Sequence, residues 1–458
     1  MKRLRVALPC TIALLVASPA PAAHGLTVRV AQSQVAPHLA GQRVVWGEQD
    51  DRHLRVLAAD EAGERATLGV VPVPAGRNAF DLAIGGGGVA ISRTGWPAST
   101  IAVEPDRYSV ALLNGAPLID CRPPTGFLSI AAPAIAGDGV TVVSPGAGCR
   151  GDAVLVRTPG VPDRTVVEPG PVVNLRVDGD WLAAIVVIGR DGWLVVHDLR
   201  TQREAYRVAL RPPSFAVGGT PQYALDVDRD GVAVVGEPNL ISPVVNGAIA
   251  PGRGCELWWA SPAEPHPHVV PIAGCATVAL HDGVLALALR EQPLQTLMTT
   301  NLAATQRTTV RRAAEIGDLD LAAGRVAWRE QSCRLKTYIR TAPLRAESPR
   351  RRTGCVIRVL SRGPLRMDAR GAIRVAVDCP EGCDGIMFAL RCKGRRCIPE
   401  VVDVRLAAGT RKLVRLVLTP RAQRLVRRGP VRATIKTFAG HGATVAVQRT
   451  IVALRRGS

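Results

Sequence analysis

The sequence predicts an all-β protein, with a seven-bladed β-propeller followed by a small C-terminal β-sandwich. Three observations lead to this prediction. Glycine and proline together supply 80 of the 458 residues, which favours many short strands joined by turns. An apolar pattern recurs along the first three-quarters of the chain, and the last quarter alternates apolar with polar residues. With 47% hydrophobic and 21% charged residues, the chain can form an ordinary core and is neither a coiled coil nor a multispanning membrane protein.

The first 25 residues have the composition of a secretory signal peptide. Lys2, Arg3 and Arg5 precede a short apolar segment, and the small residues at 20–25 provide cleavage sites. The apolar segment is too short to span a bilayer, and no later stretch has 18 uncharged apolar residues. We therefore expect residues 1–25 to be removed and the mature protein, without a transmembrane segment, to be secreted or associated with the cell surface.

The first three-quarters of the chain contain a repeat in which an apolar residue, a turn with Gly or Asp and an apolar run follow one another. The repeat occurs at 39–46, 84–91, 135–143, 177–188, 227–235, 280–289 and 321–328. The apolar runs begin at Val44, Val89, Val140, Leu182, Val232, Val284 and Val326, so successive repeats are 42 to 52 residues apart. This period is typical of propeller blades, and short continuous apolar runs suit strands buried on both faces. Residues 26–340 are therefore predicted to form the propeller.

The two ends of the propeller region predict how the ring closes. Too few residues follow Val326 to complete a four-stranded blade, whereas an extra strand at 26–30 precedes the first repeat. We expect residues 26–31 to pair with the strands of 318–341, which would leave only short sheet edges exposed.

Two of the repeats carry a more specific signature. The segments 40–46 and 323–328 read Ala-Gly-Gln-Arg-Val-Val-Trp and Ala-Gly-Arg-Val-Ala-Trp. They resemble the blades of bacterial TolB-like propellers, which often read apolar-x-Gly-Asp-Arg-Val-Val-Trp. The resemblance covers about residues 26–340 and brings no catalytic residues, so it implies a binding or scaffold role.

A Pro- and Arg-rich segment at 341–354 is predicted to be a linker, and residues 355–458 a separate module. Beyond the linker, alternating patterns predict strands interrupted by one short helix, with Thr419 as N-cap, Pro420 as first residue and Gly429 after its end. The segment 379–383, Cys-Pro-Glu-Gly-Cys, and the Arg-rich helix resemble the immunoglobulin-like β-sandwich at the carboxyl end of many secreted proteins of high-GC bacteria.

The positive charge of the protein is concentrated in the last quarter. The net charge of the whole chain is +20, and residues from 341 onward contribute +19 of it, with 26 bases and 7 acids. Arg421, Arg424 and Arg428 would share one face of the predicted helix. One hypothesis is that this module binds an anionic cell-wall polymer or another surface protein. The other is that arginine, 53 of the 58 bases, reflects coding bias.

The cysteines predict disulfides. Without Cys10 in the signal peptide, ten remain, and an even number in an exported protein indicates disulfide pairing rather than a zinc site. Proximity along the chain favours five pairs: Cys121–Cys149, Cys255–Cys275, Cys333–Cys355, Cys379–Cys383 and Cys392–Cys397.

One acidic motif suggests a metal. Asp226, Asp228 and Asp230 alternate before Gly231, as in calcium-binding loops, and Glu237 follows at the last ligand position. The flanking residues indicate strands rather than the helices of an EF-hand, which places Glu237 too far along an extended chain. The alternatives are a calcium site made by the three aspartates and an ordinary acidic β-turn. No other cofactor is expected.

The sequence shows no catalytic constellation, and its basic part lacks the interleaved aromatic residues that bind nucleic acid. The first hypothesis for the function is therefore a secreted, non-enzymatic binding or scaffold protein. The alternative is a hydrolase or lyase with its site in the central channel of the propeller, where two or three carboxylates or histidines at one mouth would favour an enzyme.

Overall fold

In the computed structural model, strands dominate and one helix occurs among the described residues. The described residues are 25–30, 33–85, 88–96, 106–115, 117–123, 133–135, 142–147, 150–158, 160–189, 191–210, 223–229, 231–236, 244–245, 248–249, 255–261, 264–266, 268–272, 276–289, 295–301, 307–313, 315–322, 324–334, 336–344, 355–361, 363–439 and 446–457. The predicted signal peptide, apart from Gly25, lies outside them. Within these ranges, no helix is long and apolar enough to cross a bilayer.

The described part of residues 26–344 contains seven four-stranded antiparallel sheets, which we number 1 to 7 in chain order. Sheet 1 consists of β2 (Ser33–Ala40), β3 (Arg43–Gln49), β4 (His53–Ala59) and β5 (Arg65–Pro72). Sheet 2 consists of β6 (Arg77–Gly85), β7 (Gly88–Trp96), β8 (Arg107–Leu112) and β9 (Pro117–Cys121). Sheet 3 consists of β10 (Ala134–Ile135), β11 (Val142–Pro145), β12 (Ala153–Arg157) and β13 (Arg164–Val167). Sheet 4 consists of β14 (Val172–Asp178), β15 (Trp181–Ile188), β16 (Asp191–Asp198) and β17 (Arg203–Leu210).

The remaining three sheets continue the same order. Sheet 5 consists of β18 (Tyr223–Val227), β19 (Val232–Gly236), β22 (Cys255–Ala260) and β23 (His268–Ile272), with the short pair β20 (Val244–Val245) and β21 (Ala248–Ile249) between them in the chain. Sheet 6 consists of β24 (Ala276–His281), β25 (Val284–Leu289), β26 (Gln295–Asn301) and β27 (Arg307–Ala313). Sheet 7 consists of β28 (Glu315–Ala322), β29 (Arg325–Gln331), β30 (Thr337–Pro343) and β1 (Thr27–Val30).

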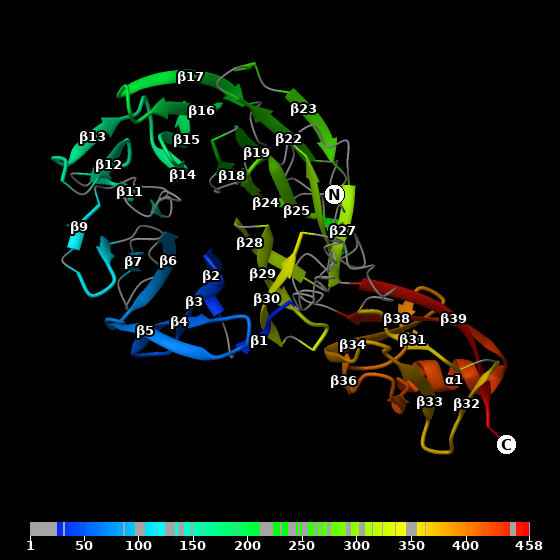
Figure 1. Ribbon diagram of the computed structural model, residues 1–458. Coiled ribbons are helices and arrows are strands. Elements are labelled where there is room, and N and C mark those ends of the chain that lie inside the picture. Colours follow the sequence, from blue (N-terminus) through cyan, green and yellow to red (C-terminus); the bar gives the residue numbers. More distant parts are fainter. Residues whose placement is uncertain are drawn as a thin grey trace, which may run out of the picture.

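The seven sheets follow one another around a ring (Figure 1), which confirms the all-β propeller prediction. The first strands of consecutive sheets contact one another all the way round, from β2 through β6, β10, β14, β18, β24 and β28 back to β2. The core is correspondingly divided into hydrophobic clusters between neighbouring sheets. The predicted apolar runs form the second strands: in β15, Leu182 to Val186 are all buried. Val140 lies outside the described residues.

The ring closes as predicted, because β1 joins sheet 7 from the opposite end of the chain. β1 pairs antiparallel with β30, and Thr27 lies opposite Arg340. Leu26 and Thr341 extend the pairing: the Leu26 N–H donates to the Thr341 hydroxyl over 3.2 Å, and the Thr341 N–H donates to the Leu26 carbonyl over 3.0 Å. Val28 and Val30 are buried against sheet 1 because alternate residues of β1 face the cluster between sheets 7 and 1.

The C-terminal module has two sheets around one hydrophobic core. The three-stranded sheet consists of β31 (Arg358–Val359), β33 (Ala372–Asp378) and β37 (Arg411–Val417). The six-stranded sheet consists of β32 (Leu365–Met367), β39 (Ala446–Arg456), β38 (Val431–Ala439), β34 (Cys383–Cys392), β35 (Arg395–Arg396) and β36 (Val402–Leu406). Helix α1 (Pro420–Arg428) has the predicted bounds: the Thr419 hydroxyl accepts the N–H of Ala422, and Gly429 follows the last turn.

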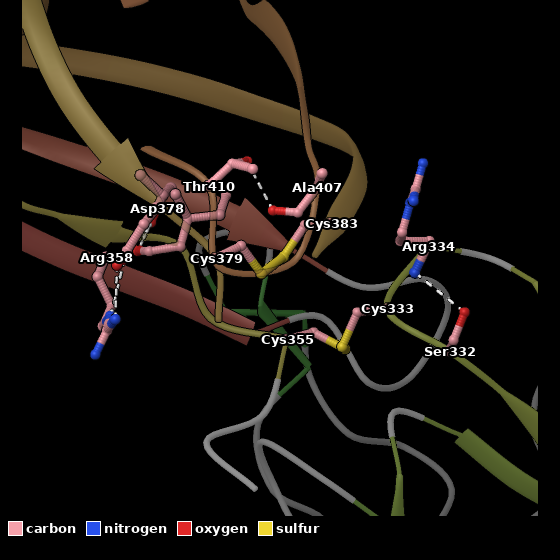
Figure 2. The surroundings of a disulfide bond; sticks show 12 residues. Ser332, Cys333, Arg334, Cys355, Arg358, Asp378, Cys379, Cys383, Ala407 and Thr410 are labelled. Carbon is pink, nitrogen blue, oxygen red and sulfur yellow. Dashed lines mark hydrogen bonds and ion pairs between the residues drawn. A yellow bond between two sulfur atoms is a disulfide. The ribbon is translucent and has the colours of Figure 1, made fainter. Parts of the chain in front are cut away.

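The junction between propeller and module differs slightly from the predicted boundaries. β30 extends through Pro343, three residues into the predicted linker 341–354, because Thr341 and Ala342 still pair with β29. Residues 345–354 lie outside the described residues. A disulfide between Cys333, after β29, and Cys355, at the start of the module, joins the two parts (Figure 2).

Candidate functional site

A cavity of about 1270 Å³ lies where the first strands of the seven sheets face one another. Residues from β2, β6, β10, β14, β18, β24 and β28 line it, so every sheet contributes to its wall. This is the central channel that the sequence hypotheses named as the place for an enzyme site.

Side chains reach the cavity in tiers, because alternate residues of a strand point to the same side. The first tier contains Ala36, Asp81, Asn174, Ala224, Thr277 and Asp318. A second tier lies two residues further along five of these six strands and contains His38, Ala83, Arg176, Asp226 and Asp320. The strand register supports this alignment. His38, Asp226 and Asp320 pair with Val45, Ala233 and Ala327, which each hold the second position of an apolar run.

The second-tier carboxylates are held by the backbone of the next sheet. Asp226 accepts the Leu280 N–H from sheet 6 over 2.7 Å, and Asp320 accepts the Leu39 N–H from sheet 1. Leu280 and Leu39 occupy the same position of the repeat, so the two hydrogen bonds are equivalent. These contacts orient the two carboxylates and join neighbouring sheets at the wall of the cavity.

Two basic side chains stand beside these acids. The His38 Nδ1 lies 3.9 Å from the Asp320 carboxylate, and the Arg176 Nε lies 4.0 Å from the Asp226 carboxylate. Arg176 also donates to the Leu175 carbonyl over 2.8 Å, which fixes part of its guanidinium. The wall of the cavity therefore offers both acidic groups, which accept hydrogen bonds, and basic groups, which can donate them.

The environment shifts the protonation of three cavity groups. Burial raises the pKa of Asp226 to about 7, although Arg176 and the Leu280 N–H oppose the shift. The protein that surrounds the cavity also raises the pKa of Asp81 by desolvation, although its side chain keeps solvent-accessible surface inside the cavity, and Arg176 again opposes the shift. Burial lowers the pKa of His38 in spite of the nearby Asp320. The cavity can thus hold a protonated carboxyl and a neutral imidazole near pH 7.

Asp81 differs from the other acids of the wall. Its carboxylate makes no hydrogen bond or ion pair with any described residue. By contrast, Asp318 accepts a hydrogen bond from the Arg329 guanidinium, and Asp226 and Asp320 accept hydrogen bonds from backbone N–H groups. Asp81 is exposed to the solvent of the cavity. It is therefore the acid most available to a ligand.

Of the three aspartates of the predicted calcium motif, the structure describes Asp226 and Asp228, whose carboxylates have different partners. Asp226 faces the cavity, while the buried Asp228 accepts the N–H groups of Gly231 and Gly283, each over 2.9 Å. Asp230 and Glu237 lie outside the described residues. Within the ranges that the structure describes, no three His, Cys, Asp or Glu residues form a metal-binding group. The calcium site stays a prediction.

Three of the five predicted disulfides are present, Cys333–Cys355, Cys379–Cys383 and Cys392–Cys397. Cys121 is also disulfide-bonded, but its predicted partner Cys149 lies outside the described residues. Cys275 lies outside them as well, so the pair Cys255–Cys275 stays a prediction.

Sequence reasoning recognised Asp226 for a different reason and missed His38, Asp81, Arg176, Asp318 and Asp320 as a group. A signal was present, because His38, Arg176, Asp226 and Asp320 each come immediately before the first apolar residue of a repeat. Comparing that position across the repeats would have revealed four polar residues at equivalent places in the ring.

No protein-family profile and no curated protein sequence matches the chain. Among solved structures, the chain is similar to the β-propeller domain of the trilobed protease from Pyrococcus furiosus, with 12% identity over 68% of this chain and 97% of that chain and a TM-score of 0.41. It is also similar to the WD40 domain of Toxoplasma gondii coronin, with 9% identity over 71% and 88% of the two chains and a TM-score of 0.43. It is similar as well to hydrazine synthase of Kuenenia stuttgartiensis, with 14% identity over 65% of this chain and 92% of that chain and a TM-score of 0.42. These likenesses concern the fold alone.

Proposed function

We propose that the protein is a secreted, non-enzymatic binding protein of the cell surface, whose central cavity holds a polar ligand. The seven sheets are, in this proposal, the seven blades of a TolB-like propeller, and the C-terminal module is immunoglobulin-like. The signal-peptide pattern and the three disulfides support an extracellular location, since disulfides persist in oxidising compartments.

The observation that carries the proposal is the ring of charged side chains around the cavity. Even when Asp226 keeps its proton, the carboxylates of Asp81, Asp318 and Asp320 outnumber the single guanidinium of Arg176 on the two tiers, so the wall favours a ligand with positive charge. Asn174, Thr277 and the free Asp81 carboxylate also suit hydroxyl groups. An amino sugar, with one ammonium group among several hydroxyls, combines both requirements.

The test is the binding of glucosamine oligomers to the full chain by calorimetry, with the N-acetylated oligomers as an uncharged control. We expect binding of the amino form only, and a loss of about tenfold or more in affinity for Asp81→Asn, since a charge-assisted hydrogen bond is worth roughly 1.5–3 kcal/mol. Glu64→Gln, at an exposed position on the turn before β5, is the control substitution. Equal binding of both oligomers, or an unchanged affinity of Asp81→Asn, would contradict the proposal.

A second candidate function is hydrolysis or lyase chemistry in the same cavity. One observation favours it: the raised pKa of Asp226 lets this carboxyl keep a proton near neutral pH, with other carboxylates in the same wall. A protonated and an ionised carboxyl are what glycoside hydrolysis requires. Release of new reducing ends from the glucosamine oligomers by the wild type, abolished in Asp226→Asn, would establish the enzyme. Binding without new reducing ends would favour the binding protein.

A further inference from the structure

The outward face of the six-stranded sheet in the C-terminal module is strongly cationic. Residues of β38 alternate in burial, with Val431, Ala433 and Ile435 in the core, so the even-numbered residues face outward. On the four strands β32, β39, β38 and β34, the strand register then places six exposed or half-exposed bases on this outward face: Arg366, Arg391, Arg432, Lys436, Arg449 and Arg455. We call these six residues the cationic sheet face.

The bases of this face lie on four adjacent strands. Lys436 lies directly opposite Arg449 on β39, and Arg391 on β34 lies diagonally across from Lys436. Figure 1 shows β38 and β39 side by side along the module. Neighbouring strands are about 4.8 Å apart, so these like charges stand close together and repel one another.

The six bases have no acidic partner among the described residues. β32, β38 and β39 contain no Asp or Glu. The exposed Asp403 of β36 lies on the same side of the sheet, opposite Met387 of β34, but none of the six bases forms an ion pair with it or with another described residue. Elsewhere in the module, the exposed bases Arg358 and Arg415 do have acidic neighbours, Asp378 and Asp368. Partial burial and, to a smaller extent, the charges of Arg449 and Arg391 lower the pKa of Lys436.

The shape and composition of the face indicate what could bind it. A sheet presents its charges in rows at regular spacing, which fits a long molecule with repeated anionic groups. The face has one strongly exposed large apolar side chain among the described residues, Ile451. A single isoleucine offers little apolar area for insertion into lipid, so a hydrophilic polyanion is favoured over a membrane.

We propose that the cationic sheet face is the docking surface of the module for an anionic polymer with phosphate groups along its chain. Helix α1, whose Arg421, Arg424 and Arg428 are also exposed, is not that surface. Arg427 and Arg428 stand in the last helical turn, where basic side chains stabilise the helix through its dipole. The cationic sheet face belongs to the module, so its ligand is independent of what the propeller cavity binds.

The experiment compares two variants of the full chain that lose the same charge. One is the sheet variant Arg391→Gln/Lys436→Gln/Arg449→Gln, and the other is the helix variant Arg421→Gln/Arg424→Gln/Arg428→Gln. The probe is poly(glycerol phosphate), with vesicles of phosphatidylglycerol in a parallel arm and low and high salt in both. Thermal unfolding and non-reducing electrophoresis verify that each variant is folded and oxidised.

We expect the wild type to bind the polymer at low salt and to release it at high salt. The sheet variant should bind about a hundredfold more weakly, because each base near an anionic surface contributes about 1 kcal/mol. The helix variant should change by less than about threefold. Equal losses in the two variants would show that net charge alone acts and would overturn the proposal. Absence of polymer binding by the wild type, or binding to the vesicles alone, would overturn it too.

Discussion

Cys333, in the turn after β29 of the propeller, is bonded through its sulfur to Cys355 of the C-terminal module, with the two Cα atoms 5.2 Å apart. The bond spans 22 residues of sequence and bypasses the Arg-rich segment that was predicted to be a linker. Both cysteines are buried and belong to the core of the module (Figure 2). The last sheet of the propeller is thus covalently fixed to the module at its first residue.

Limited proteolysis should reveal this bond. Trypsin is expected to cleave the wild type among Arg350, Arg351 and Arg352, and the two fragments should stay joined on a non-reducing gel and separate after reduction. In Cys333→Ser/Cys355→Ser they should separate without reductant. The double variant should also lose about 3 kcal/mol of unfolding free energy, since the bond restricts the unfolded chain. Fragments of the wild type that separate without reductant would contradict this prediction.

Closure of the ring by β1 should contribute strongly to stability. Val28 is 3% exposed and packs in the cluster between sheets 7 and 1, so Val28→Asp would bury a charge without a partner. We expect it to lower the free energy of unfolding by at least about 3 kcal/mol in denaturant titrations. The exposed neighbour Arg29 provides the control, and Arg29→Gln should stay within about 0.5 kcal/mol of the wild type. Similar values for both variants would argue against the pairing.

The raised pKa of Asp226 should make stability depend on pH. The folded state holds the proton up to about pH 7, whereas an ordinary aspartate loses it near 3.8. Between these values the folded state binds more protons than the unfolded state, so stability falls as pH rises, by at most about 1.4 kcal/mol per pH unit from this group. Denaturant titrations from pH 4.5 to 7.5 should show a flatter profile for Asp226→Asn. An identical slope in the two proteins would show that Asp226 ionises normally.

The cap of α1 offers a small and well-controlled test. The Thr419 hydroxyl accepts the Ala422 N–H over 3.3 Å at the start of the helix. Thr419→Ala should cost about 1 kcal/mol of unfolding free energy, and Thr419→Ser, which keeps the hydroxyl, should cost much less. Equal costs, measured by thermal unfolding, would mean that the methyl group of Thr419 rather than its hydroxyl matters.

Local patterns in the sequence determined most of the architecture. The apolar runs of the repeat became the buried second strands of the sheets, because a continuous apolar strand is stable only between two other layers. The partner of the strand at 26–30 could be predicted from the sequence, because the last repeat had too few residues for a fourth strand; in the structure this strand pairs with β30. Three disulfides joined cysteines that are close in sequence, and Thr419, Pro420 and Gly429 marked the bounds of α1.

Only the tertiary structure decided where the charged groups meet. Asp226 belonged to a local acidic motif in the sequence, yet the alternation of β18 turns it into the cavity, on the same tier as Asp320 and Arg176. These residues come from separate sheets, so no local pattern contains them together. The same holds for the module: its excess of arginine is plain in the sequence and points to the helix, whereas Arg391, Lys436 and Arg449 become one surface through strand register. Strand pairing and the side of each strand that is buried depend on contacts between distant segments, and those contacts exist only in the folded chain.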